Sequence, residues 1–116
     1  MKTAAQVAGG AAEETAEQFL ARHGLAIVER NYRTRLGEID LIARDGEELV
    51  FVEVRFRSDE RFGGALESIT PGKRRRIIAA ARQYLMRFAA VPPCRFDVVC
   101  LDRHEPTWLK GAFDAS

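Results

Sequence analysis

Cysteine is scarce in this sequence, and its two cysteines form no recognisable metal or disulfide motif. Cys94 and Cys100 flank an apolar stretch and lack the C-x-x-C spacing typical of zinc ligands and redox-active pairs. This pattern argues against a small scaffold held together by disulfides. We therefore expect both to be buried free thiols.

Long hydrophobic runs are also absent. No stretch approaches the roughly 20 apolar residues that a transmembrane helix needs. Residues 1–12 are rich in alanine and glycine and are interrupted by Gln6, so they lack the apolar core of a secretory signal peptide. These features predict a cytoplasmic protein without a membrane segment, in which residues 1–11 form a flexible tail.

Strong compositional bias is missing as well. Hydrophobic residues make up 47% and charged residues 30% of the 116 residues, which is close to the average of globular proteins and does not favour intrinsic disorder. The length suits one hydrophobic core and leaves no room for a second domain. The sequence therefore predicts a single globular domain over residues 12–116, and it contains no internal repeat.

Acidic residues are missing from residues 73–87, although the net charge of the chain is only +1. This segment contains six cations, namely Lys73, Arg74, Arg75, Arg76, Arg82 and Arg87. Four of them lie where a helix is expected to begin, which fits binding to phosphate backbones without sequence preference. Aromatic residues are not interleaved with them, so stacking on single-stranded bases is not predicted. A solvated helix face is the alternative.

Hydrophobic periodicity predicts the order helix, three strands, helix, strand. The expected helices span residues 12–23 and 71–88, the second with Thr70 as N-cap and Pro71 at its first position. The expected strands span residues 25–33, 38–43, 49–57 and 95–101, with a loop over 58–68 and a short closing element over 108–113. Three antiparallel strands followed by a helical crossover make an α/β fold, in which helices flank a mixed sheet.

Charged residues interrupt the two central strands. The stretch GEIDLIARDGEELVFVEVRFR, residues 37–57, contains the hairpin signal Asp45-Gly46. Because side chains alternate along a strand, one face is predicted to be wholly apolar. That face carries Ile39, Leu41, Ala43, Val50, Val52, Val54 and Phe56. The other face carries Glu38, Asp40, Ile42, Phe51, Glu53 and Arg55. The two apolar side chains on this charged face indicate that a helix covers part of it.

The length of the hairpin loop decides which charges meet. A two-residue turn would place Glu38 opposite Glu53, whereas a four-residue loop over residues 45–48 would place Asp40 opposite Glu53. A five-residue loop would bury Asp40 in the apolar face, and burying a lone carboxylate costs several kcal/mol. We therefore expect one of the first two registers, both of which keep the acids on one face.

Paired carboxylates followed by a cation suit phosphodiester chemistry. Asp40 and Glu53 are like charges that repel unless a cation lies between them. Mg²⁺ or Mn²⁺ fits this role, because hard cations take one or two carboxylates together with waters and substrate phosphates. The Val54 carbonyl would add an oxygen ligand, and Arg55 would stabilise charge in the transition state. A solvated sheet face held by ion pairs is the alternative.

The same stretch resembles the signature of the YraN-like uncharacterised bacterial family, whose fold belongs to the restriction-endonuclease-like, PD-(D/E)xK nuclease superfamily. The resemblance covers nearly the whole chain. It runs through AEETAEQFLARHGLAIVERNYRTRLGEIDLIA, FVEVRFRS, ITPGKRRRIIAAARQYL, RFDVV and GAFDA, in this order. It implies a restriction-endonuclease-like core and metal-dependent hydrolysis of DNA. By analogy with Holliday-junction resolvases, it also implies action on branched DNA and a homodimer.

The resemblance assigns roles residue by residue. Asp40 matches the metal-binding aspartate of the motif, and Glu53 matches its second acid. Arg55 stands where the motif has lysine. Glu13 matches a helix glutamate that joins the metal site in the resolvases, and Lys73 matches a position that contacts phosphate.

The arginine at position 55 is the main departure from the motif. Lysine can shift its pKa and activate a water molecule, whereas arginine stays charged and cannot act as a base. Arg55 would therefore only bind phosphate or stabilise charge. The alternative function is a catalytically inactive module that keeps the nuclease fold and binds nucleic acid or a protein partner.

Overall fold

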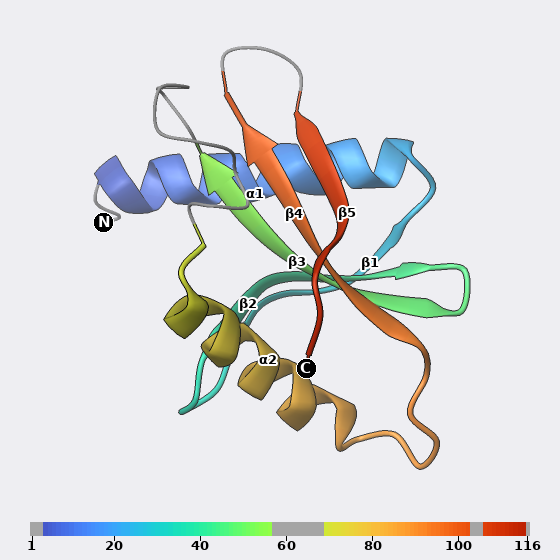
Figure 1. Cartoon of the computed structure of the whole chain (residues 1–116). Coiled ribbons are helices and arrows are strands. Elements are labelled where there is room, and N and C mark those ends of the chain that lie inside the picture. Colours follow the sequence, from blue (N-terminus) through green and yellow to red (C-terminus); the bar gives the residue numbers. More distant parts are fainter. Residues whose placement is uncertain (1–3, 57–68, 103–105, 116) are drawn as a thin grey trace.

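The chain folds around one five-stranded sheet with a helix on each face. The computed structural model in Figure 1 describes residues 4–56, 69–102 and 106–115, with side chains from residue 11 onward. Its elements are α1 (Ala4–Arg22), β1 (Ala26–Arg33), β2 (Glu38–Asp45), β3 (Glu48–Phe56), α2 (Pro71–Leu85), β4 (Cys94–Leu101) and β5 (Thr107–Phe113). The loop expected over residues 58–68 lies outside the described residues.

The sheet is mixed, as the order of elements predicts. Its strand order is β1-β2-β3-β4-β5. The first three strands form an antiparallel meander. α2 then returns the chain to the same end of the sheet, so that β4 pairs with β3 in parallel. The closing element expected over residues 108–113 is a fifth strand, antiparallel to β4. This α/β arrangement is compatible with a restriction-endonuclease-like core.

Helices α1 and α2 lie on opposite faces of the sheet (Figure 1), and each face carries its own half of the core. On the α1 side the buried residues are Ala16, Leu20, Leu25, Leu41, Ala43, Val50, Val52, Val99 and Leu101. On the α2 side they are Ile39, Ile42, Leu49, Phe51, Ile69, Ile77, Ala80, Ala81, Tyr84, Phe96, Val98 and Cys100. The expectation that a helix covers part of the charged face is therefore confirmed, because α2 packs on Ile42 and Phe51.

Three expectations about the core are wrong in detail. Phe56, expected on the apolar face, is 70% exposed at the end of β3. Ile39 packs on the α2 side and not with Leu41, although strict alternation would place both on one face. The change of face lies where the β2–β3 ladder ends, at the pair Leu41 and Val52. Cys100 is buried, but Cys94 is exposed, since it is the first residue of β4.

α1 begins at Ala4, although its periodicity predicts a start at Ala12. The intervening residues are helical, and they include Gly9 and Gly10, each of which costs about 1 kcal/mol relative to alanine in a helix. Glu13 therefore lies in the middle of the helix. The acids expected near the helix start are absent from the first turn of α1.

The start of α2 follows its sequence signals. The Thr70 hydroxyl accepts a hydrogen bond from the backbone N–H of Lys73 at 3.1 Å, and Pro71 occupies the first turn. Such a cap stabilises a helix by about 1 kcal/mol. The cap fixes where the helix begins, and so it fixes the direction in which its first cations point.

The β2–β3 hairpin adopts the register that pairs Arg44 with Leu49. This is the register expected for a four-residue loop. The connection is tighter than that loop, however, because Asp45 also pairs with Glu48 and the chain reverses at residues 46 and 47. Gly46 has a φ of 65°, which glycine adopts without a Cβ clash.

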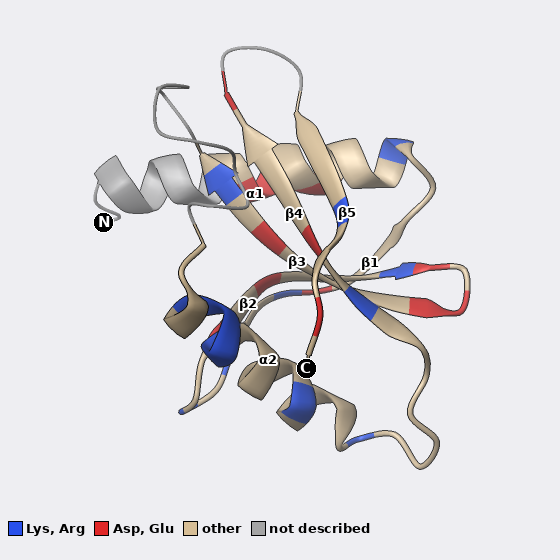
Figure 2. Ribbon diagram, in the orientation of Figure 1, with Lys and Arg blue, Asp and Glu red and all other residues tan. Residues whose placement is uncertain are grey.

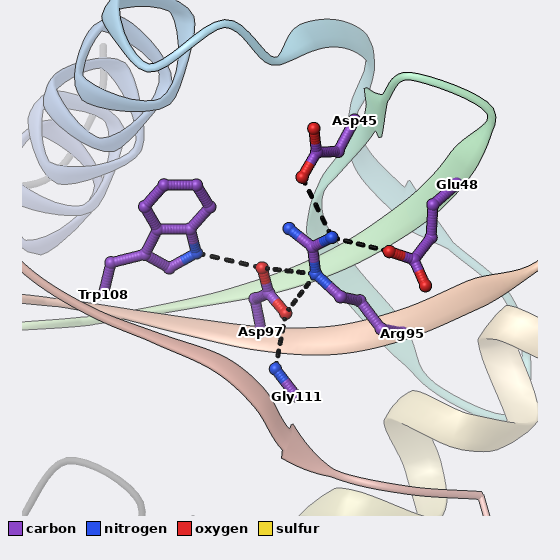
Figure 3. A network of polar contacts seen from close by, with 6 residues as sticks. All are labelled: Asp45, Glu48, Arg95, Asp97, Trp108 and Gly111. Atoms are coloured by element: carbon purple, nitrogen blue, oxygen red, sulfur yellow. Dashed lines mark hydrogen bonds and ion pairs between the residues drawn. The ribbon is translucent and has the colours of Figure 1, made fainter.

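A polar network centred on the buried Asp97 joins this hairpin to β4 and β5 (Figure 3). The Arg95 guanidinium contacts Asp45 at 3.0 Å and Glu48 at 2.7 Å, and its Nε donates to Asp97 at 3.0 Å. Asp97 is fully buried and also accepts hydrogen bonds from Trp108 Nε1 and from the backbone N–H of residue 111, both at 2.9 Å. The network holds β2, β3, β4 and β5 in fixed relation.

Neither helix in the described part of the chain has an apolar stretch long enough to cross a membrane. This agrees with the absence of long hydrophobic runs in the sequence.

Candidate active site

Two acidic residues meet where β2 and β3 run side by side. Asp40 and Glu53 are the residues next to Leu41 and Val52, the pair at which the β2–β3 ladder ends, and they are close enough for the charge of Asp40 to act on Glu53. Asp40 is half-buried, and its Oδ2 accepts a hydrogen bond from the backbone N–H of Val54 at 2.8 Å. Glu53 is almost fully buried, with 4% exposure. The fold therefore brings together the two carboxylates that the sequence pairs.

The environment of Glu53 disfavours its ionised form. Burial is the main cause, and the negative charge of Asp40 adds to it, so that the pKa of Glu53 rises to about 7. A hydrogen bond from Lys73 acts in the opposite direction. Two like charges are thus held close together in a poorly solvated place, and the pair favours a neighbouring cation.

That neighbouring cation is Lys73, which comes from the first turn of α2. Its Nζ lies 2.9 Å from Glu53 Oε1. Arg55 is farther away, with its Nη1 3.6 Å from the same oxygen. From the sequence, Lys73 is assigned only to phosphate contact. Lys73 lies twenty positions beyond Glu53 in the chain, and the two residues meet only because α2 packs on the sheet.

Glu13 of α1 lies within electrostatic reach of the same place. Partial burial raises the pKa of Glu13 first, and the charge of Asp40 raises it further. A hydrogen bond from Asn31 and the charge of Arg33 lower it. The helix glutamate is therefore close enough to the strand pair to interact with it, although α1 packs on the opposite face of the sheet from α2.

This donor set fits a divalent cation that is held partly by substrate. Among the described residues, no three histidine, cysteine, aspartate or glutamate side chains are close enough together to form a metal cage. Mg²⁺ needs no such cage, since it commonly takes one or two carboxylates, waters and substrate phosphates. Asp40 and Glu53 meet this requirement. The backbone of Val54 lies beside Asp40, and a metal contact of the Val54 carbonyl stays a prediction.

The four adjacent cations of α2 point to two sides. Lys73 and Arg76 line a cavity of about 360 Å³ that α2 shares with the β1–β2 turn. Arg74 turns away, with its Nε donating to the Ile69 carbonyl at 3.2 Å and its guanidinium 5.6 Å from the Phe113 ring centre. Arg75 lines a separate hollow beside the end of β5. The helix therefore does not present one uniform basic face.

Two further cations of this cavity were missed by sequence reasoning. Arg33 is the last residue of β1 and Arg35 belongs to the β1–β2 turn, and both line the cavity together with Lys73 and Arg76. Figure 2 shows the basic start of α2 next to this turn, with acidic residues of β2 and β3 nearby. The alternation of cations in YRTRLG is the only sequence signal for them.

Comparison with known proteins identifies the family. The model of "Uncharacterised protein family UPF0102" matches residues 12–101. The chain belongs to this family. A UPF0102 protein of Janthinobacterium sp. (strain Marseille) is 53% identical over 114 residues, which cover 98% of this chain and 93% of the relative. One from Cupriavidus taiwanensis is 57% identical over 112 residues, with 95% and 85% covered.

The UPF0102 match agrees with the resemblance found in the sequence. A UPF0102 protein of Herminiimonas arsenicoxydans is 48% identical over 114 residues, covering 98% of this chain and 92% of the relative. The matched range of the family model contains Glu13, Asp40, Glu53, Arg55 and Lys73. The description of the family names no activity.

Proposed function

We propose that this UPF0102 protein is a metal-dependent nuclease that hydrolyses phosphodiester bonds in DNA. The observation that carries the proposal is the meeting of Asp40, buried Glu53 and Lys73, with Lys73 Nζ 2.9 Å from Glu53. Two carboxylates and one lysine amine from three elements converge at one point of the sheet. An open cavity with basic walls lies next to them.

The two carboxylates would hold Mg²⁺ or Mn²⁺. A cation held there would polarise the phosphodiester and lower the pKa of a water nucleophile. The Val54 N–H fixes one oxygen of Asp40, so the carboxylate is oriented before substrate arrives. Glu13 would support the metal from the α1 side.

Lys73 would supply what the arginine at position 55 cannot. Its amine can donate hydrogen bonds to a phosphate oxygen or to the attacking water, and a lysine can also exchange a proton. Arg55 keeps its charge and would stabilise the extra negative charge of the transition state. The departure from the nuclease motif is therefore compensated by a lysine from another element.

Two finer features of this function, action on branched or structured DNA and a homodimer, rest on the resemblance to Holliday-junction resolvases. The proposed cytoplasmic location rests on the sequence, which lacks a long hydrophobic run and the apolar core of a signal peptide. Contacts to the phosphate backbone would come from the α2 cations Lys73, Arg74, Arg75 and Arg76. The first and last of these line the cavity beside the β1–β2 turn, and Lys73 also contacts Glu53.

The test is cleavage of branched and linear DNA by purified protein during a titration with Mn²⁺. We expect cleavage by the wild type and its loss in Asp40→Ala. Glu47→Ala is the matched control, because Glu47 is an exposed acid in the turn of the same hairpin. Cleavage that survives in Asp40→Ala would contradict the proposed site, and a wild type that neither binds Mn²⁺ nor cleaves would contradict the proposed activity.

A second function is supported by the cations around Glu53. Lys73 and Arg55 both contact its Oε1, so the carboxylate is paired without a metal. This favours a catalytically inactive module that keeps the nuclease fold and binds nucleic acid or a protein partner. Salt-sensitive retention of DNA, without Mn²⁺ binding or cleavage, is the result expected for that function. Absence of DNA retention as well would indicate a protein partner.

A further inference from the structure

The cavity between the β1–β2 turn and α2 is strongly basic. Its walls carry Arg33 from the end of β1, Arg35 from the β1–β2 turn, and Lys73 and Arg76 from the helix, and Glu38 is the one acid among the described residues that line it. The cations come from two segments that are separated in sequence, so they surround the cavity from two sides. A cavity with this charge favours an anionic ligand.

Internal hydrogen bonds order the β1–β2 turn, which carries Arg35 and directly follows Arg33. The backbone N–H of Thr34 donates to the Gly37 carbonyl at 2.8 Å. The Thr34 hydroxyl oxygen accepts from the backbone N–H groups of Leu36 at 3.0 Å and Gly37 at 3.1 Å. The turn is therefore fixed before a ligand binds, which lowers the entropic cost of binding.

Close backbone contact fastens the turn to the helix. A Cβ atom on Gly37 would lie 2.1 Å from the Arg76 carbonyl oxygen. Only glycine allows this approach, so the spacing between the two basic walls is set by the backbone. The cavity keeps its width independently of the side chains that line it.

The charges of the cavity are poorly neutralised within the protein. Arg33 is 3.6 Å from Glu38, and both side chains are mostly exposed, at 74% and 59%. A solvent-exposed ion pair of this kind contributes little free energy. In the part of the chain that the structure describes, neither Arg35 nor Arg76 forms an ion pair through its side chain. These guanidinium groups are available to a ligand.

Lys73 connects the cavity to the carboxylate site. It lines the cavity, and its Nζ lies 2.9 Å from Glu53 Oε1. An anion in the cavity would therefore lie next to any group bound at the two carboxylates. A nucleic-acid strand meets this condition, because it carries regularly spaced phosphates that guanidinium groups bind through paired N–H donors.

We propose that this cavity binds a backbone phosphate of duplex DNA next to the phosphate at the carboxylate site, with Arg33 and Arg35 as its anchors. The inference rests on the proposed function, which it extends from the cleaved bond to the flanking part of the strand. It assigns the β1–β2 turn, on the opposite side of the cavity from α2, to the DNA-binding surface.

The experiment measures binding of a fluorescent duplex by anisotropy in EDTA, between 50 and 200 mM salt, so that cleavage plays no part. The test variant is Arg33→Gln/Arg35→Gln. The matched control is Arg22→Gln/Arg44→Gln, which removes the same charge from exposed positions at the end of α1 and at the far end of β2. Circular dichroism melting checks that both double variants fold, and the single variant Arg35→Gln replaces the test variant if it does not.

We expect the slope of log affinity against log salt to fall by about 1 in the test variant, because the two arginines together neutralise one phosphate in the cavity. The loss of affinity across this salt range should then be about fourfold smaller than in the wild type. The control should keep the wild-type slope. This result can be obtained whether or not the protein cleaves DNA, so it is independent of the proposed activity.

Equal slopes in the test and control variants would overturn the proposal. A calorimetric titration with inorganic phosphate separates the DNA backbone from a small anion as the ligand. Binding of inorganic phosphate that depends on Arg33 and Arg35, together with unchanged duplex binding in the test variant, would assign the cavity to a small anion and would also overturn the proposal.

Discussion

At the scale of single residues, the site is defined by what surrounds Glu53. It is an almost fully buried acid that faces Asp40 and contacts two cations. A solvated ion-pair face, the alternative that the sequence left open, would leave this carboxylate in water. The burial of Glu53 is therefore what separates the candidate site from an ordinary charged strand.

The raised pKa of Glu53 predicts a specific pH dependence of stability. The pKa of this carboxyl is near 4.5 in the unfolded chain and about 7 in the folded chain. Between these two pH values the unfolded chain therefore binds fewer protons than the folded chain. The free energy of unfolding should therefore fall as the pH rises from about 4.5 to 7, and this contribution levels off above it. Removing the titrating group should remove this fall.

Glu53→Gln tests this in urea denaturation at pH 5 and pH 8. Going from pH 5 to pH 8, we expect the wild type to lose on the order of a few kcal/mol relative to the variant. The variant also leaves Lys73 without its carboxylate partner, which changes the free energy of unfolding by the same amount at both pH values. Comparing the pH dependence of the wild type with that of the variant cancels this constant effect. Parallel pH profiles for the two proteins would contradict the assignment.

At the scale of elements, local signals fixed some features and tertiary packing fixed others. Thr70 and Pro71 specify the start of α2 because their effect is local. The cost of burying Asp40 limited the possible registers of β2 and β3 to two. The sequence could not show, however, that the chain reverses at residues 46 and 47. The contact of Lys73 with Glu53 and the cavity with Arg33 arise only when α2 packs on the sheet.

The contact of the β1–β2 turn with α2 predicts the effect of Gly37→Ala. The new methyl group would meet the Arg76 carbonyl at 2.1 Å, so the turn or the helix must move. We expect a loss of about 1–3 kcal/mol in the free energy of unfolding, together with weaker duplex binding although no charge changes.

Gly72→Ala is the matched control for this prediction. The nearest atom to its new methyl group is 3.7 Å away, an ordinary contact in the first turn of α2. Urea denaturation and anisotropy measure the two effects. If Gly37→Ala behaves like Gly72→Ala, the turn does not depend on close backbone approach.

At the scale of the whole molecule, one assembly of polar residues forms the candidate site and another stabilises the fold. The Asp40, Glu53 and Lys73 group connects β2, β3 and α2, while the Asp97 network ties the hairpin to β4 and β5 (Figure 3). Sequence reasoning found the acids of the first assembly and missed the second, because Asp97 lies in an apolar run and its partners come from other strands. Fold and acid pair were thus predictable, while the cations that complete both assemblies were not.

The second assembly predicts a large structural effect without a direct chemical one. Asp97→Ala removes a fully buried carboxylate that accepts from Arg95, Trp108 and Gly111. Because the half-buried Arg95 guanidinium loses its buried partner, we expect a loss of about 3–5 kcal/mol in the free energy of unfolding. Urea denaturation measures it.

Glu48→Gln provides the comparison for Asp97→Ala. Glu48 contacts the same guanidinium, but its side chain is 35% exposed, so water replaces part of the lost interaction and the effect should be much smaller. Similar losses in the two variants would show that burial does not set the strength of the network.

The most direct test of the central claim compares single-turnover cleavage of DNA in Mn²⁺ by Lys73→Ala and Arg55→Ala. If Lys73 completes the site with Asp40 and Glu53, its loss should slow cleavage by about 10²–10⁴-fold, the range typical of a positioned proton donor or acceptor. Loss of Arg55 should cost less, and the exposed control Arg44→Ala should cost nothing. Cleavage by Lys73→Ala at the wild-type rate would contradict the account.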